Sequence, residues 1–180
     1  MVGGEKFPLR LRESELLAFG SAIERLAKQK NAGVILLSSP RSPKDCLTIV
    51  SQRVTQPKWT PSSGQANAYG AALTKGDLFC VTSDSVSMVA EMLGMQKPVF
   101  VFQLPQSKFA VHWNSDEGLP ATLARNGILS PPRNTAGLMQ DLINQGLVSD
   151  LTREGEVASP PDVHSLYDAA VSRVRSLVGL

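Results

Sequence analysis

Three short apolar segments constrain the fold of this chain more than any other feature. They are Val34–Leu37, Leu78–Thr82 and Pro98–Phe102, and each consists almost entirely of aliphatic and aromatic residues. Strands of this kind are covered on both faces, as in a parallel sheet. Stretches with the apolar spacing of amphipathic helices lie between them. This alternation predicts an α/β fold, a Rossmann-like three-layer sandwich with a mainly parallel sheet.

Capping residues mark the ends of the predicted helices. Ser14 is placed to begin a helix that continues to Lys30, and Ser42 is placed to begin the next one. Gly94 is placed to end a helix over Val86–Leu93.

Weaker patterns predict further elements. A short strand is expected at residues 58–60, a linker at 149–162, and helices at 69–74, 120–126, 134–144 and 163–178. The last helix, within the C-terminal segment 163–180, has the apolar spacing of a helix that docks on the domain.

Composition limits the class of protein. With 180 residues, 42% of them hydrophobic and 19% charged, the chain fits one globular domain over 1–180. A net charge of +2 argues against a nucleic acid or a membrane surface as partner. The chain lacks a long apolar run and an apolar leader, which predicts a cytoplasmic protein without a transmembrane segment. Cys46 and Cys80 lack metal or disulfide spacing, and we expect buried thiols.

The N-terminus begins abruptly for an α/β domain. Val2 is followed directly by Gly3 and Gly4, so it resembles the end of a strand that runs into a glycine turn. Either the first strand is very short, or the chain is one domain of a longer protein. In the second case the partners include a missing N-terminal domain of the same protein.

The predicted topology gathers the loops. Right-handed crossovers place every strand-to-helix loop at the same edge of the sheet. Ligands of such sheets bind outside the carboxyl ends of the strands. We therefore expect four loops to share a ligand-binding edge: Gly3–Phe7, Ser38–Ser42, Ser83–Ser85 and Gln103–Trp113.

The turn after the second apolar segment has the composition of a phosphate site. Asp84, Ser85, Val86 and Ser87 stand where a buried strand passes into a helix. The free N–H groups of a helix N-terminus attract anions, and the serine hydroxyls can add hydrogen bonds. The alternative is that Asp84 and Ser85 only cap the helix.

Other candidate ligand residues lie at the same edge or on the same helix. Gly3 and Gly4 allow a ligand to approach the backbone, and Ser39 and Arg41 follow the first apolar segment. Glu91 lies within the helix that begins at the phosphate turn, where it can reach ribose hydroxyls. The plainer alternatives are a solvated loop arginine and a surface glutamate.

Several kinds of chemistry find no support. His112 and His164 are isolated, so we expect no metal site and no cofactor. The sequence contains no P-loop, no GxSxG and no GxGxxG. Asn67 and Tyr69 are expected to cap and pack a short helix. Because the sequence shows none of these catalytic motifs, we assign no catalytic residues.

One segment resembles a known family. The run from Val81 to Glu91, with its Asp-Ser-Val-Ser-Met core, is followed by Gly94-Met95-Gln96-Lys97-Pro98-Val99. This pattern is similar to that of the mitochondrial fission, elongated-mitochondria family. The early glycine pair, the Ser-Pro-Arg-Ser-Pro stretch and Asn67-Ala68-Tyr69 agree with the family in order. The resemblance covers roughly residues 2–130.

The resemblance implies a function. The family looks like the GT-B glycosyltransferases, and this chain resembles their C-terminal, donor-binding domain. The serine-rich turn at Ser85, Val86 and Ser87 would contact a diphosphate, and Glu91 a ribose. The resemblance thus implies a nucleotide-sugar, or another phosphorylated small molecule, as ligand, and a chain that is inactive without its other domain.

Two other functions stay open. One is a non-catalytic member of the family that acts through protein–protein contacts. The other is a nucleoside-diphosphate-sugar epimerase. A short-chain epimerase requires a Tyr-x-x-x-Lys pair, whereas Tyr69 is followed at that spacing by Leu73. A non-hydrolysing 2-epimerase would require another domain.

Overall fold

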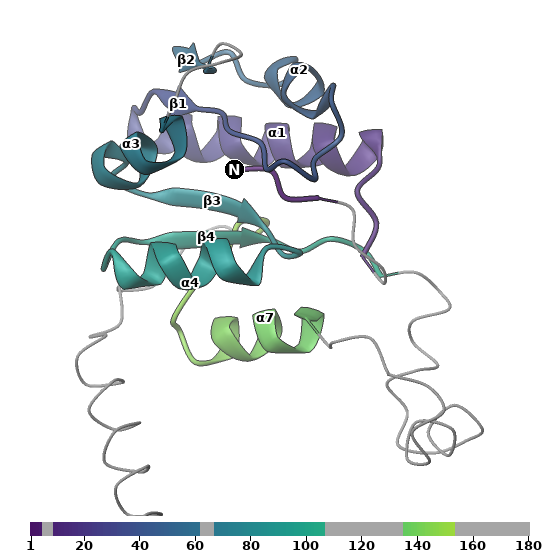
Figure 1. The fold of residues 1–180 in the computed structure, drawn as a ribbon, viewed down its shortest axis with the longest axis vertical. Coiled ribbons are helices and arrows are strands. Elements are labelled where there is room, and N and C mark those ends of the chain that lie inside the picture. Colours follow the sequence, from purple (N-terminus) through teal and green to yellow (C-terminus); the bar gives the residue numbers. More distant parts are fainter. Residues whose placement is uncertain (5–8, 62–66, 107–134, 154–180) are drawn as a thin grey trace, which may run out of the picture.

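The structure is a computed structural model that describes residues 1–4, 9–61, 67–106 and 135–153. Figure 1 shows helices on both sides of a central sheet. In chain order the elements are α1 (Glu13–Lys30), β1 (Val34–Ile35), α2 (Cys46–Ser51), β2 (Lys58–Trp59), α3 (Ala68–Lys75), β3 (Phe79–Thr82), α4 (Val86–Gly94), β4 (Val99–Phe102), α7 (Thr135–Asn144) and β5 (Ser149–Asp150).

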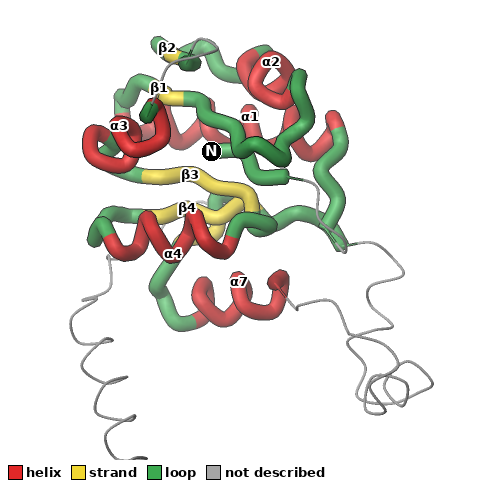
Figure 2. The backbone as a smooth tube through the Cα atoms, in the orientation of Figure 1, coloured by secondary structure: helices red, strands yellow, loops and turns green. Residues whose placement is uncertain are grey.

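All strand pairs between these elements are parallel. β1 pairs with β2, and β3 pairs with β4, which pairs with β5. Figure 2 shows β3 and β4 side by side between α1 and α4. The predicted α/β fold with a parallel sheet is confirmed.

Residues 1–3 join the two parts of the sheet. The Val2 amide donates to the Leu37 carbonyl at 2.8 Å, and the Ser39 amide donates to the Val2 carbonyl at 3.0 Å. On the other side, the Met1 nitrogen donates to the Cys80 carbonyl at 2.5 Å. The order across the sheet is therefore β2, β1, residues 1–3, β3, β4, β5. This is the doubly wound arrangement, and its strand order reverses between residues 1–3 and β3.

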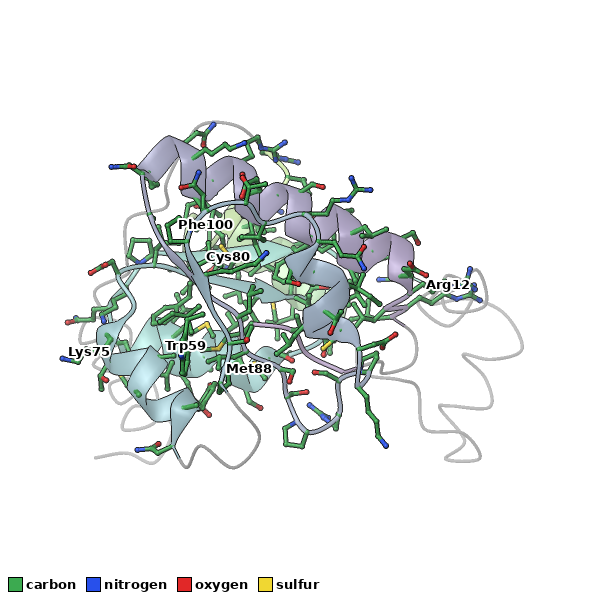
Figure 3. The ribbon with its side chains drawn as sticks, turned by 90° about the horizontal axis from the view of Figure 1, so that it is seen from above. Arg12, Trp59, Lys75, Cys80, Met88 and Phe100 are labelled. Atoms are coloured by element: carbon green, nitrogen blue, oxygen red, sulfur yellow. The ribbon has the colours of Figure 1, made fainter. Side chains whose placement is uncertain are left out.

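The central strands are buried on both faces. On β4, Phe100 and Phe102 pack with α1 and α2, whereas Val99 and Val101 pack with α3, α4 and α7. The Phe19 and Phe102 rings pack in a tilted arrangement, with 5.4 Å between their centroids and 55° between their planes. Figure 3 places Phe100 in the interior and Arg12 at the periphery. Both faces of β4 are apolar because both are covered, which confirms the reasoning from the apolar segments.

Three predicted helix ends are wrong in detail. α1 begins at Glu13, with Arg12 in the capping position, where its amide donates to the Glu15 carboxylate at 2.9 Å. α2 begins at Cys46 rather than at Ser42, whose hydroxyl serves the glycine turn instead. α4 includes Gly94, and the left-handed residue after it is Gln96.

Two strand predictions also need correction. Ser149–Asp150, predicted as the start of a linker, forms β5 at the edge of the sheet. Its two residues are polar and carry no apolar pattern, so the sequence gives no strand signal there. Ile35 was predicted to be covered, but its side chain is 42% exposed beside Trp59, which is 44% exposed. The reason is that β1 and β2 form the lateral side of the sheet farthest from β5.

Several predictions lie outside the described residues. They are the helices at 120–126 and 163–178, the C-terminal docking segment 163–180, Asn134, and most of the loop at 103–117. Within the described part of the chain, Cys46 is buried and Cys80 half-buried, and both thiols are free. Burial raises the pKa of Cys80 to about 11. No described helix has the length and apolarity that a bilayer crossing requires.

A buried carboxylate connects α1 to the chain before β2. Glu24 accepts hydrogen bonds from the Thr55 hydroxyl, from the Thr55 amide at 2.7 Å and from the Gln56 amide at 3.2 Å. Lys28 lies 3.0 Å from it. The Thr55 hydroxyl, above all, holds the pKa of Glu24 at about 2, below its ordinary 4.5.

This connection predicts a pH-dependent stability. Because the folded-state pKa is lowered, Glu24 stabilises the fold above its ordinary pKa, and this contribution is lost as pH falls from about 4.5 towards about 2. Urea unfolding over pH 2–7 should show Glu24→Gln less stable than the wild type at neutral pH, with the difference shrinking in acid. The exposed control Asp141→Asn should keep the wild-type profile. Parallel profiles for the wild type and Glu24→Gln would contradict this role.

Candidate functional site

A pocket lies at the carboxyl ends of the strands, where the strand order reverses. Its volume is about 420 Å³. We call it the strand-end pocket and define it by its lining residues: Ser39, Pro40, Arg41, Asp84, Ser85, Val86, Ser87, Met88, Thr135 and Leu138. They come from the loop after β1, the start of α4 and the start of α7.

The glycine pair forms the base of this region by close backbone contact. The Gly3 amide donates to the Thr82 hydroxyl at 2.8 Å, and the Gly4 amide donates to Asp84 Oδ2 at 2.7 Å. A Cβ on Gly3 would lie 2.0 Å from Asp84 Oδ2. Glycine is therefore required because the β3–α4 turn leaves no room for a side chain. The two glycines do not line the pocket but position the residues that do.

The loop after β1 is held to the glycine turn by two serines. The Ser42 hydroxyl donates to the Val2 carbonyl at 2.9 Å and lies 2.5 Å from the Gly3 carbonyl oxygen. It also accepts the Ser39 amide, at 2.9 Å. The Ser39 hydroxyl accepts the Arg41 amide at 3.3 Å. This network fixes the backbone that carries Arg41 at the pocket.

The start of α4 has no side-chain cap. Ser85 occupies the capping position but makes no capping hydrogen bond. Its hydroxyl donates to Asp84 Oδ2 at 3.0 Å, and Asp84 is also engaged by Gly4. Neither residue therefore caps α4, which removes the simplest structural explanation for the pair. The first residues of the helix line the strand-end pocket, and a helix N-terminus carries a partial positive charge of about half a unit.

Arg41 brings a positively charged side chain to this pocket. Arg41 is exposed at its rim, and it forms no ion pair with any described residue. The N-terminus of α7, at Thr135, enters the same pocket and adds a second helix dipole. Ser87 is exposed, so its hydroxyl is open to a ligand. The arrangement can bind an anion with backbone amides, hydroxyls and a guanidinium.

Glu91 lies apart from the other candidates. It is not in the lining of the strand-end pocket, and its Oε2 accepts the Tyr69 hydroxyl at 2.7 Å. Burial, then this hydrogen bond and the carboxylate charge, raise the pKa of Tyr69 to about 12. Glu91 thus joins α4 to α3, a contact that sequence reasoning did not find.

The structure brings six of the nine candidate residues into one pocket and places Gly3 and Gly4 beneath it. Sequence reasoning missed Thr82, Ser42, Thr135 and the apolar Met88 and Leu138. Thr82 and Met88 flank the serine-rich turn at Asp84–Ser87, so their positions were a usable signal. Thr135 and Leu138 arrive from a distant helix, and nothing local marks them.

A second pocket lies at the opposite edge of the sheet. Its volume is about 210 Å³, and α1, β1, α3 and the start of β3 line it. Its only charged lining residues are Lys30, Lys75 and Asp77. It lies at the amino ends of the strands, where the crevice of a doubly wound fold does not form.

A family model matches residues 1–160, and its description is Mitochondrial fission ELM1. The chain belongs to this family. Searches of curated proteins and of solved structures each returned no match. The resemblance proposed from the Asp-Ser-Val-Ser-Met run is therefore confirmed at the level of the family.

The close packing of the glycine turn predicts that it tolerates no side chain. In Gly4→Ala, the new Cβ would lie 2.5 Å from Arg41 Cβ and 2.8 Å from the Arg41 carbonyl oxygen. The backbone of Arg41 cannot move away from the new Cβ as the end of a flexible side chain could. We therefore expect the free energy of unfolding to fall by about 1–3 kcal/mol. Urea denaturation measures it.

Gly94→Ala is the matched control. A Cβ on Gly94 meets nothing within 4 Å, and the residue is helical. Alanine there should leave stability equal or raise it by up to ~1 kcal/mol. A Gly4→Ala protein as stable as Gly94→Ala would contradict the packing described for the turn.

Proposed function

We propose that this chain binds a nucleotide-sugar through its diphosphate in the strand-end pocket. One observation carries the proposal: the uncapped start of α4 and the unpaired Arg41 face the same pocket. A helix start normally receives a side-chain cap. Here the two residues that could supply one, Asp84 and Ser85, bond elsewhere, so the amides stay available for phosphate oxygens.

The pocket fits a ligand with an anionic and an apolar part. Its volume of about 420 Å³ falls in the range of small-molecule sites. Ser85, Ser87 and Arg41 supply polar groups, and Pro40, Met88 and Leu138 supply apolar surface. A phosphate alone would use only the first set. A nucleotide diphosphate uses both.

The resemblance to GT-B donor-binding domains extends this to a role in glycosyl transfer. Helix dipoles, hydroxyls and Arg41 would stabilise a leaving diphosphate electrostatically. The chain resembles only the donor-binding half of a GT-B enzyme, and such an enzyme holds its acceptor and general base in the cleft between its two domains. We therefore infer that catalysis, if the whole protein performs it, requires groups beyond those described.

Calorimetric titration with UDP, ADP, GDP and CMP tests the proposal. We expect one nucleoside diphosphate to bind saturably and Arg41→Gln to weaken that binding about tenfold or more, because a charge-assisted hydrogen bond is lost. Lys75→Gln is the matched control, since Lys75 lines the pocket at the opposite edge of the sheet. Equal losses in the two variants would indicate a general charge effect.

Ser87→Asp separates binding from folding. An acidic residue in the first turn of a helix stabilises it by about 0.3–1 kcal/mol. The same carboxylate would repel a phosphate at the start of α4. We expect nucleotide binding to disappear while thermal stability stays equal or rises, and Ser87→Ala should show only a partial loss of binding. A folded wild-type protein that binds none of the nucleotides would contradict the proposal.

A non-catalytic role through protein contacts is the second candidate. The observation that favours it is the pair Ile35 and Trp59, which lie side by side on β1 and β2 and are 42% and 44% exposed. Exposed apolar residues away from a ligand site are typical of interaction surfaces. Failure of every nucleotide to bind would favour this candidate.

A further inference from the structure

Asp84 holds an oxygen that the fold does not use. The residue is 6% exposed and forms part of the wall of the strand-end pocket. Its Oδ2 accepts both the Gly4 amide and the Ser85 hydroxyl. Its Oδ1 is buried and accepts no hydrogen bond from any described residue. Among the described residues it is the sole buried side-chain oxygen or nitrogen without a partner.

An unpaired buried oxygen of this kind is unfavourable. Leaving a buried acceptor unsatisfied costs about 1–3 kcal/mol, and more for a charged group. Native structures rarely retain such a group without a role. Asp84 stands where the strand order reverses, within a pocket otherwise suited to anions, so its position points to a ligand rather than to packing.

The chemistry of this oxygen is opposite to that of its surroundings. Arg41, Ser87 and the start of α4 attract an anion, whereas a carboxylate oxygen accepts hydrogen bonds and repels phosphate. A bare phosphate would gain from the first group and lose to Asp84. A ligand with a hydrogen-bond donor near its phosphate would satisfy both.

We propose that Asp84 is a specificity-determining residue. It selects ligands that have a hydroxyl group close to their phosphate, as a sugar phosphate does. The donor hydroxyl bonds the carboxylate and the phosphate lies at the start of α4. The inference rests on the proposed function, because it requires a phosphate in the strand-end pocket. It adds that the sugar contributes to recognition, so that a sugar phosphate binds more tightly than a phosphate group without a neighbouring hydroxyl.

The test compares two phosphate monoesters of similar size and charge. Glucose 1-phosphate carries ring hydroxyls, and cyclohexyl phosphate carries none. Their dissociation constants are measured by amide chemical-shift titration at pH 7.5 with a chelator present. The wild type should bind glucose 1-phosphate roughly tenfold more tightly, the factor that corresponds to one hydrogen bond to a charged group.

Asp84→Asn should remove this preference. Its amide oxygen can still accept the Gly4 N–H, while the charge is lost and an NH₂ donor now meets the hydroxyl. We expect the ratio of the two constants to fall to about one and cyclohexyl phosphate to bind more tightly than in the wild type. Asp77→Asn removes the same charge at the opposite edge of the sheet and should leave the ratio unchanged.

Three results would overturn the inference. A wild-type ratio near one does so directly, even if Asp84→Asn fails to fold. An unchanged ratio in a folded Asp84→Asn does so as well. The third result is an affinity for cyclohexyl phosphate that rises with added Mg²⁺ in the wild type but not in Asp84→Asn. It would indicate that Asp84 binds a cation instead of a hydroxyl group. If both esters bind with equal affinity, the proposed function stays intact and only this inference fails. If neither ester binds and no nucleotide binds, the inference and the proposed function both fail.

Discussion

The chain from Met1 to Gly4 is the constraint on which the rest of the structure depends. Its backbone pairs with the loop after β1 on one side and with β3 on the other. Among the described residues no other strand joins the pair β1–β2 to β3–β5. The hydrogen bond between Gly4 and Asp84 closes this junction at the carboxyl edge. The place where the sheet is joined is therefore also the place where the pocket forms.

This coupling explains why the pocket has mixed electrostatics. Asp84 accepts hydrogen bonds from the Gly4 amide and from the Ser85 hydroxyl, and α4 has no side-chain cap from Ser85. The same arrangement leaves Asp84 Oδ1 without a partner among the residues that the structure describes. The proposed ligand site follows from this one structural demand, because it would combine a helix start that attracts an anion with an acceptor for a donor group. A phosphate next to a hydroxyl matches that pair of features, as in a sugar phosphate.

Much of this arrangement could be predicted from sequence because its signals are local. The all-apolar segments that became β3 and β4, and the serine-rich turn between β3 and α4, each lie within a few adjacent residues. The family match over residues 1–160 confirms the family resemblance drawn from the run that contains this turn. What could not be predicted depends on partners distant in sequence. β5 is a strand because β4 offers it hydrogen bonds, Ser42 serves the glycine turn forty residues before it, and Glu91 is held by Tyr69.

The most direct test is to follow backbone amides by NMR while inorganic pyrophosphate is added to the protein. A phosphate at the start of α4 accepts hydrogen bonds from its first N–H groups, so the Val86 and Ser87 amide protons should shift downfield and saturate together with the Arg41 amide. Amides of Ala32 and Gly33, which line the pocket at the opposite edge, should not move. Shifts confined to that opposite edge, or none at millimolar pyrophosphate, would contradict the assignment of the strand-end pocket as a phosphate site.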